Sequence, residues 1–292
     1  PHPRTCEGDA TPLFGCVQYE AGHAKAVQRR QTCCFRGRDG AYYAFLSTPG
    51  LQINVRTEEA TFKTYRDALT VDGSFITELH AVALVGGEKH KLATASFWTD
   101  ELNEFTTGPN MINGTCGDRG QFFLGTGGYK KCEEMEIPVR FSSARFRVPG
   151  WVIKVAAAPV WGHISGPRHR LDVSLHAHGD EAALSQAHGL IGQSFGWRAA
   201  RDGKRDLYPT EGRFRTSAMA EGAIEGNAAM YELPGPLATE CPWRTPMGAA
   251  CCYHPADSFC SGAGRHSFAG AAARQCPTGY GHGNSGARHS WS

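Results

Sequence analysis

Apolar residues recur at every second position through the middle of the chain. Four segments show this alternation, at residues 135–139, 144–148, 151–155 and 171–175. Because side chains of a β-strand point alternately to the two faces of its sheet, a two-residue period indicates a strand with one buried and one solvated face. The pattern therefore predicts half-buried strands between residues 135 and 175.

A second group of strands is predicted earlier in the chain. Residues 51–55 alternate between apolar and polar types, and the strand-like stretches 75–85 and 92–98 flank the turn-forming pair Gly86-Gly87. Apolar residues occupy both parities of 75–85, which is typical of a strand that is buried on both sides. We expect a β-hairpin here.

The pattern divides the chain into three regions. Residues 1–34 lack periodicity and contain cysteines, so they are predicted to form a loop-rich flank. Residues 35–232 are predicted to be mainly β, as an antiparallel β-sandwich or a curved double sheet, with a long glycine-rich loop at 100–134. Residues 233–292 are rich in Cys, Gly and Pro, which predicts a tail of disulfide-tied loops or disordered chain.

Composition and charge narrow the possible partners and the compartment. The net charge is only +2, so the overall charge does not favour binding to nucleic acid. The sequence has no run of about 18 apolar residues, so no membrane-spanning helix is predicted. Eleven cysteines are many for a cytosolic chain. Because disulfides persist in oxidising compartments, we predict a secreted or cell-surface protein.

Two local features agree with this compartment. Asn113-Gly-Thr115 is an acceptor sequence for an N-linked glycan, so Asn113 is the predicted glycosylation site. Cys116 and Cys132 lie 16 positions apart. A disulfide between them, which spacing alone does not prove, would restrict the unfolded chain by about 3 kcal/mol on the loop-entropy model.

A metal site is one reading of the strand that begins at Leu171. Asp172, His176 and His178 share the wetter face of this strand, and Asp180 follows. Carboxylate and imidazole groups on one face can bind zinc or copper. The alternative is that the exposed face of the strand is simply polar.

A binding surface is predicted on the neighbouring strands. Arg145 and Arg147 share one strand face and could meet anionic glycans, with Trp151 beside them. Trp98 and Trp161 are further aromatic candidates for a sugar site. The alternatives are a solvated basic strand face and aromatic residues packed in the core.

The order of these signals resembles a von Willebrand factor type D domain. The features that carry the resemblance are Phe35-Arg-Gly37, Tyr43 and Leu46, the alternating strand 51–55, and the glycine turn His188-Gly-Leu-Ile-Gly-Gln193. The turn is also similar to the C-terminal region of inter-alpha-trypsin inhibitor heavy chains. The block 35–232 further resembles uncharacterised secreted proteins of algae and other protists.

The resemblance implies a β-rich extracellular module used in assembly or adhesion, and it transfers no catalytic residue. Ile191 stands where the family has a cysteine in the closing turn, so the usual disulfide framework is not reproduced. Some type D domains carry an acidic calcium-binding turn after the closing glycines, which here corresponds to Asp202 and Asp206. No cofactor is predicted, and calcium and zinc are the alternatives considered.

The sequence favours a secreted structural or adhesive β module that acts by protein–protein contact and is not an enzyme. Its expected partners are other extracellular proteins or copies of itself, with glycans as a further class. A carbohydrate-binding module is the first alternative. A metal-dependent enzyme that uses the face of Asp172, His176 and His178 is the second.

Overall fold

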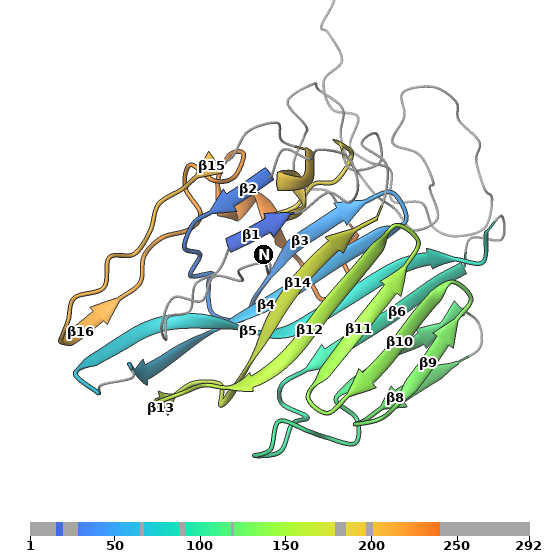
Figure 1. The fold of residues 1–292 in the computed structure, drawn as a ribbon, viewed down its shortest axis with the longest axis horizontal. Coiled ribbons are helices and arrows are strands. Elements are labelled where there is room, and N and C mark those ends of the chain that lie inside the picture. Colours follow the sequence, from blue (N-terminus) through green and yellow to red (C-terminus); the bar gives the residue numbers. More distant parts are fainter. Residues whose placement is uncertain are drawn as a thin grey trace, which may run out of the picture. The chain divides into compact units, whose positions relative to one another are not determined.

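The computed structural model describes residues 16–19, 29–64, 67–87, 91–117, 120–178, 185–196 and 201–239. All of these residues belong to one compact unit of the chain (Figure 1). Most of them lie in strands, and the two largest sheets are antiparallel in their main ladders. The predicted mainly β fold is therefore confirmed.

The larger sheet has nine strands. Its main path runs β17 (Glu232–Leu233), β3 (Ala41–Thr48), β4 (Leu51–Lys63), β5 (Leu69–Val85), β6 (Lys91–Trp98), β7 (Ile112–Cys116) and β8 (Gln121–Leu124). Two short strands join its sides, β13 (His163–Ser165) beside β4 and β16 (Gly212–Arg215) parallel to β5. β5 and β6 pair from Glu78 with Trp98 to Val85 with Lys91, which confirms the predicted hairpin.

The smaller sheet has five strands and contains the four alternating segments. Its order is β14 (His169–Ala177), β12 (Trp151–Pro159), β11 (Ser143–Val148), β10 (Met135–Arg140) and β9 (Tyr129–Cys132), seen as a yellow-to-green sheet in Figure 1. Burial alternates along β11 and β12 as the sequence predicts, with Phe146 and Ile153 inside and Arg145 and Lys154 outside. The period of two residues thus placed each side chain on the correct face.

The main core lies between the two sheets. Phe146 and Ile153 of the smaller sheet belong to the same buried cluster as Leu79 and Phe97 of the larger one. β5 is buried on both parities along most of its length, as predicted. The prediction of a β-sandwich is confirmed by this arrangement.

The β4–β5 hairpin extends beyond the part of β5 that pairs with β6. There β13 lies along β4, and β16 lies along the first residues of β5. A second cluster of buried apolar residues lies on this extension, formed by Ala60, Phe62, Leu69, Val71 and Phe75 together with Val160, which follows β12. We call this extension the hairpin arm.

The glycine turn at 188–193 packs against β3. His188 and Ser47 exchange two backbone hydrogen bonds of 2.7 Å. Gly189 has a φ of +103°, and a Cβ there would lie 2.7 Å from the carbonyl oxygen of Phe45. Only glycine fits this close approach without strain, so the turn has a structural reason for its sequence.

Three expectations need correction or fall outside the described residues. The predicted loop at 100–134 contains β7, β8 and β9, because strands of four or five residues between glycines are too short to show a clear period. The flank 1–34 contains β1 (Cys16–Tyr19) and β2 (Arg29–Thr32), which form a third sheet with β15 (Arg201–Asp202). The tail from residue 240 onward lies outside the described residues.

The helical segments of the described chain are short turns such as η3 (Gly192–Gly196) and η4 (Ala228–Tyr231). None of the described helices has the length and apolar character needed to cross a membrane.

Candidate anion-binding face

The outer face of the five-stranded sheet carries an excess of positive charge. Its outward-pointing charged residues are Lys131, Arg140, Arg145, Arg147, Lys154 and Arg170, together with Glu136 and Asp172. We call this surface the basic face. Six basic residues stand against two carboxylates, although the whole chain has a net charge of only +2. Positive charge is therefore concentrated on this surface.

Two like charges lie directly opposite each other at the centre of the basic face. Arg145 on β11 pairs in register with Lys154 on β12, and both side chains are exposed. Among the described residues, neither has a carboxylate within ion-pair distance. Like charges in directly opposed cross-strand positions destabilise a sheet, so this pair lowers the stability of the folded protein.

The remaining charges of the face are partly neutralised. The Glu136 carboxylate lies 3.3 Å from Lys131 Nζ and 3.6 Å from Arg147 Nη1. Arg170 Nη2 lies 3.5 Å from Asp172 Oδ2. All of these side chains are at least 30% exposed, so the pairs contribute little to stability. The uncompensated centre thus stands between two weak ion-pair groups.

One row of residues crosses all five strands at this centre. Tyr129 on β9 is opposite Pro138 on β10, and the register of β10 with β11 puts Pro138 opposite Arg145. Lys154 then follows on β12 and Ser174 on β14. With strands about 4.8 Å apart, the row is about 19 Å long. Tyr129 is 55% exposed at its end.

His176 lies diagonally beside this row, and the positive charges of the row affect its pKa. Partial burial lowers its pKa below the ordinary 6.5, and the positive charges of Lys154, His178 and Arg145 lower it further. His176 is therefore held in the neutral form near neutral pH. It reports electrostatically on the same like-charge centre.

The predicted metal site is not assembled. Asp172, His176 and His178 do share one face, but Asp172 and His176 are four residues apart on a strand, about 13 Å. No group of three metal-ligating side chains occurs anywhere in the described part of the chain. Asp180 lies outside the described residues. Strand geometry explains the correction, because Asp172 lies too far along the strand from His176 to share a metal with it.

The calcium turn implied by the resemblance is likewise not assembled. Asp206 accepts hydrogen bonds from the backbone N–H groups of Ser217 and Ala218, at 2.8 and 3.3 Å. Asp202 Oδ1 lies 3.5 Å from Arg205 Nη2. Both carboxylates therefore have protein partners.

Trp151 does not join Arg145 and Arg147 in a binding surface, and this prediction was wrong. Its side chain is only 6% exposed and packs edge-to-face on Phe195, with ring centroids 4.9 Å apart. Trp151 has the same parity as Ile153 on β12, so it points into the core. The two arginines point to the opposite face. The parity of the strand in the sequence already indicates that Trp151 and Lys154 point to opposite faces.

The three tryptophans considered for a sugar site lie in different environments. Trp98 is half-buried on the larger sheet, where its Nε1 donates a 3.1 Å hydrogen bond to Asn113 Oδ1. Trp161 is 66% exposed, just after the end of β12. A single aromatic platform made by all three is therefore absent.

The predicted glycan acceptor and disulfide both involve β7. Asn113 is half-buried within this strand and not in a loop, because β7 pairs with both β6 and β8. Glycosylation of Asn113 remains a prediction. Cys116 and Cys132 form a disulfide, as predicted, with their Cα atoms 5.4 Å apart. The bond connects β7 of the larger sheet to β9 of the smaller one.

A different arrangement of charge lies on the outer face of the larger sheet. Arg56 Nη1 donates to Glu78 Oε1 at 2.7 Å, and Tyr42 donates its hydroxyl to Glu78 Oε2 at 3.1 Å. The His80 ring nitrogens lie 2.9 Å from Glu78 Oε2 and 2.8 Å from Ser96 Oγ. We call these five residues the buried polar network.

The buried polar network was missed by sequence reasoning. Burial would raise the pKa of Glu78, but the hydrogen bonds from His80 and Arg56 and the positive charge of Arg56 outweigh burial and lower the pKa. Ser96, His80 and Glu78 are hydrogen-bonded in the same succession as the catalytic groups of some hydrolases. His80 is fully buried, however, and the network links adjacent strands of one sheet. The network therefore provides hydrogen-bond partners for polar groups that are buried. The only sequence signal was a set of polar residues inside strands buried on both faces.

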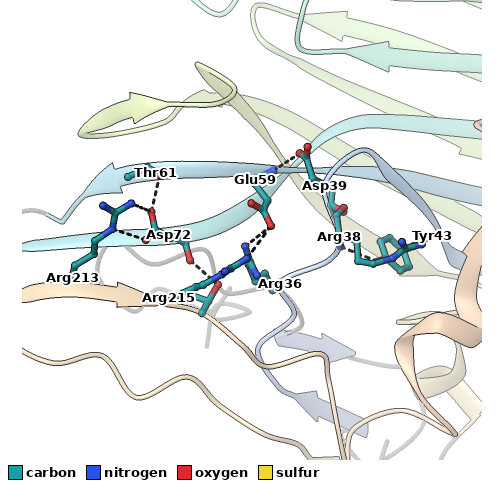
Figure 2. Close-up of polar contacts among 11 residues, drawn as sticks. Arg36, Arg38, Asp39, Tyr43, Glu59, Thr61, Asp72, Arg213 and Arg215 are labelled. Atoms are coloured by element: carbon teal, nitrogen blue, oxygen red, sulfur yellow. Dashed lines mark hydrogen bonds and ion pairs between the residues drawn. The ribbon is translucent and has the colours of Figure 1, made fainter.

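A third charged group ties distant segments to the base of the hairpin arm (Figure 2). Arg36 and Arg215 both approach the Glu59 carboxylate, and Arg213 donates two hydrogen bonds to Asp72, at 2.8 and 3.0 Å. A hydrogen bond from Arg213 lowers the pKa of Asp72. A surface cavity of about 630 Å³ borders this group. Each of these three arginines has a carboxylate partner, which favours a structural role.

No protein-family model matches the chain, and no curated protein matches it either. The resemblance to von Willebrand type D domains therefore remains a prediction. The function has to be argued from the geometry of the basic face.

Proposed function

We propose that the protein is a structural or adhesive β module of an extracellular assembly, which acts by surface contact through the basic face. The observation that carries this proposal is the directly opposed pair of Arg145 and Lys154, exposed and without a carboxylate partner in the described chain. A surface that costs stability and stays open to solvent is better explained by an external anionic partner than by folding.

The scaffold behind the face supports this role. The basic face is formed by regular strands whose inner side chains, such as Phe146 and Ile153, are fully buried in the main core. Side chains on packed strands keep fixed spacings, about 6.7 Å along a strand and 4.8 Å across it. Such a surface is preorganised for contact and loses little conformational entropy on binding.

The extracellular setting rests on the cysteines. The Cys116–Cys132 bond joins β7 of the larger sheet to the edge strand β9 of the smaller one, and such bonds persist in oxidising compartments. The partners we propose are other extracellular proteins, glycans or further copies of this chain. Non-reducing peptide mapping of the protein from its native source tests the setting, since both the disulfide and a glycan on Asn113 are expected.

An adhesion assay tests the contact surface. Microspheres coated with purified protein are allowed to settle on carboxylated, sulfated or amine-bearing surfaces and are then sheared off. We expect retention on the two anionic surfaces and not on the amine surface. The double variant Arg145→Glu/Lys154→Glu should lose most of the retention, because it reverses the charge at the centre of the face.

The matched control reverses the same two residue types elsewhere. Lys204→Glu/Arg205→Glu makes an identical change in net charge at two exposed residues outside the basic face. It should keep most of the retention. If both double variants lose retention equally, net charge and not this face causes the adhesion, and the proposal is wrong.

A further inference from the structure

We infer that the basic face binds an acidic polysaccharide, whose chain lies across the five strands along the row from Tyr129 to Ser174. This inference rests on the proposed function and specifies the partner of the same surface. The chemistry shared by its ligands is a sugar ring that carries sulfate or carboxylate groups.

The row offers the two kinds of contact that such a ligand needs. Arg145 and Lys154 supply adjacent positive charges, and Arg147 lies two residues from Arg145 on the same strand face. Guanidinium groups bind sulfate and carboxylate by paired hydrogen bonds, and ammonium groups bind them as point charges. The spacing is fixed by the sheet, so the anionic groups of a linear polymer can be met in succession.

Tyr129 supplies a contact for the sugar ring. It is 55% exposed on β9 and is opposite Pro138, so the ring and the proline form an apolar end to the row. An exposed aromatic ring combines an apolar surface with a hydroxyl group, which suits the mixed surface of a pyranose. At the other end, Ser174 offers a hydroxyl group beside Lys154.

The composition of the face disfavours a protein partner. Protein interfaces depend on a few anchors, mostly Trp, Tyr and Arg, that fill desolvated pockets near their centre. Between the charged side chains, the outward uncharged residues of β12 are Val152, Ala156 and Ala158, and none of these is a large anchor. The charged residues at the centre, Arg145 and Lys154, are exposed and do not line a desolvated pocket. Charge complementarity with a polyanion therefore supplies the affinity at the centre of the face.

Binding to defined polymers tests the inference. Purified protein is titrated with dextran sulfate, polygalacturonate, neutral dextran and poly-glutamate of matched length, at low and at physiological salt. We expect binding to both acidic polysaccharides, weakened by salt, and none to neutral dextran. Arg145→Glu/Lys154→Glu should weaken this binding about tenfold or more, since reversed charges repel the ligand.

Tyr129 separates sugar recognition from simple charge attraction. Tyr129→Ala should weaken binding to both polysaccharides several-fold but leave retention on carboxylated surfaces unchanged, and Tyr129→Phe should keep polysaccharide binding. Thermal unfolding of each variant verifies that it is folded. If poly-glutamate binds as tightly as the polysaccharides and Tyr129→Ala changes nothing, the face recognises charge alone and an acidic protein replaces the polysaccharide.

The two failures are distinguishable. Retention on anionic surfaces that requires Arg145 and Lys154, without polysaccharide binding, would overturn this inference and leave the proposed function intact. Loss of both dependences would overturn the proposed function as well.

Discussion

The outer faces of the two sheets treat charge in opposite ways. On the larger sheet, Glu78 is almost fully buried, and Arg56 and His80 both contact its carboxylate. On the smaller sheet, Arg145 and Lys154 are exposed side by side with no carboxylate between them. Opposite charges in contact satisfy buried groups, whereas like charges in contact cost stability. The comparison supports the proposal that the basic face serves a partner, whereas the buried polar network serves the fold.

The largest effect should come from the bond that joins the two sheets. Replacing Cys116 and Cys132 by serine should lower the free energy of unfolding by about 3 kcal/mol, because the unfolded chain regains the entropy of a loop of about 15 residues. Urea unfolding with and without reductant measures this loss. An unchanged midpoint after reduction would show that the bond does not constrain the chain in solution.

Removing the central carboxylate of the buried polar network should cost almost as much. Glu78→Gln leaves Arg56 and His80 without their shared anion, and we expect a loss of about 2–3 kcal/mol. This lies at or below the low end for a broken buried pair, because the Arg56 side chain is still 28% exposed. Denaturant unfolding at neutral pH provides the measurement.

The corresponding change on the basic face serves as the control for that prediction. Glu136→Gln removes a 30%-exposed carboxylate that lies near Lys131 and Arg147. Exposed pairs contribute about 0–1 kcal/mol, so its effect should be far smaller. Equal losses for Glu78→Gln and Glu136→Gln would contradict the contrast between the two faces.

Lys154→Glu should stabilise the protein and weaken its function at the same time. The new carboxylate is placed opposite Arg145, so an attractive pair replaces a repulsive one, and we expect a gain of about 0.5 kcal/mol. Lys204→Glu, which instead removes an exposed pair with Glu221, should give no gain. If Lys154→Glu destabilises the protein, the central like-charge pair is not the cost that we assign to it.

The smallest effect concerns pH and reports on the same centre. The groups facing His176 are Lys154, Arg145, His178 and Ser174, and its pKa in the folded protein lies below 6.5. Because the unfolded chain takes up this proton at a higher pH than the folded chain, the free energy of unfolding decreases as the pH falls below about 6.5. Above that pH the contribution of the neutral imidazole is fully present.

An NMR titration of the His176 ring measures this shift directly. The midpoint should lie below 6.5 in the protein and move upward in Lys154→Glu, where a nearby positive charge becomes negative. Binding of a sulfated polymer should raise the midpoint in the same direction. A midpoint that is the same in both proteins would mean that the basic residues do not act on His176.

Much of the fold could be predicted because period-two alternation is a local property. The alternation in residues 144–148 and 151–155 predicted the two strands found there, and its parity assigned Phe146 to the core and Arg145 to the solvent. The same parity assigns Trp151 to the buried face of β12, in conflict with its predicted place on the binding surface. The short strands in residues 100–134 could not be predicted, because four or five residues between glycines carry too little pattern to be recognised.

The sequence by itself determined which side chains face solvent on β11 and β12, and therefore that two arginines share a surface. Only the tertiary structure decided which strands lie side by side. Register placed Lys154 opposite Arg145 and Tyr129 at the end of the same row, and it separated Asp172 from His176 along β14. The physical reason is that alternation along a strand is set by the local backbone, whereas pairing across a sheet depends on contacts between residues distant in sequence.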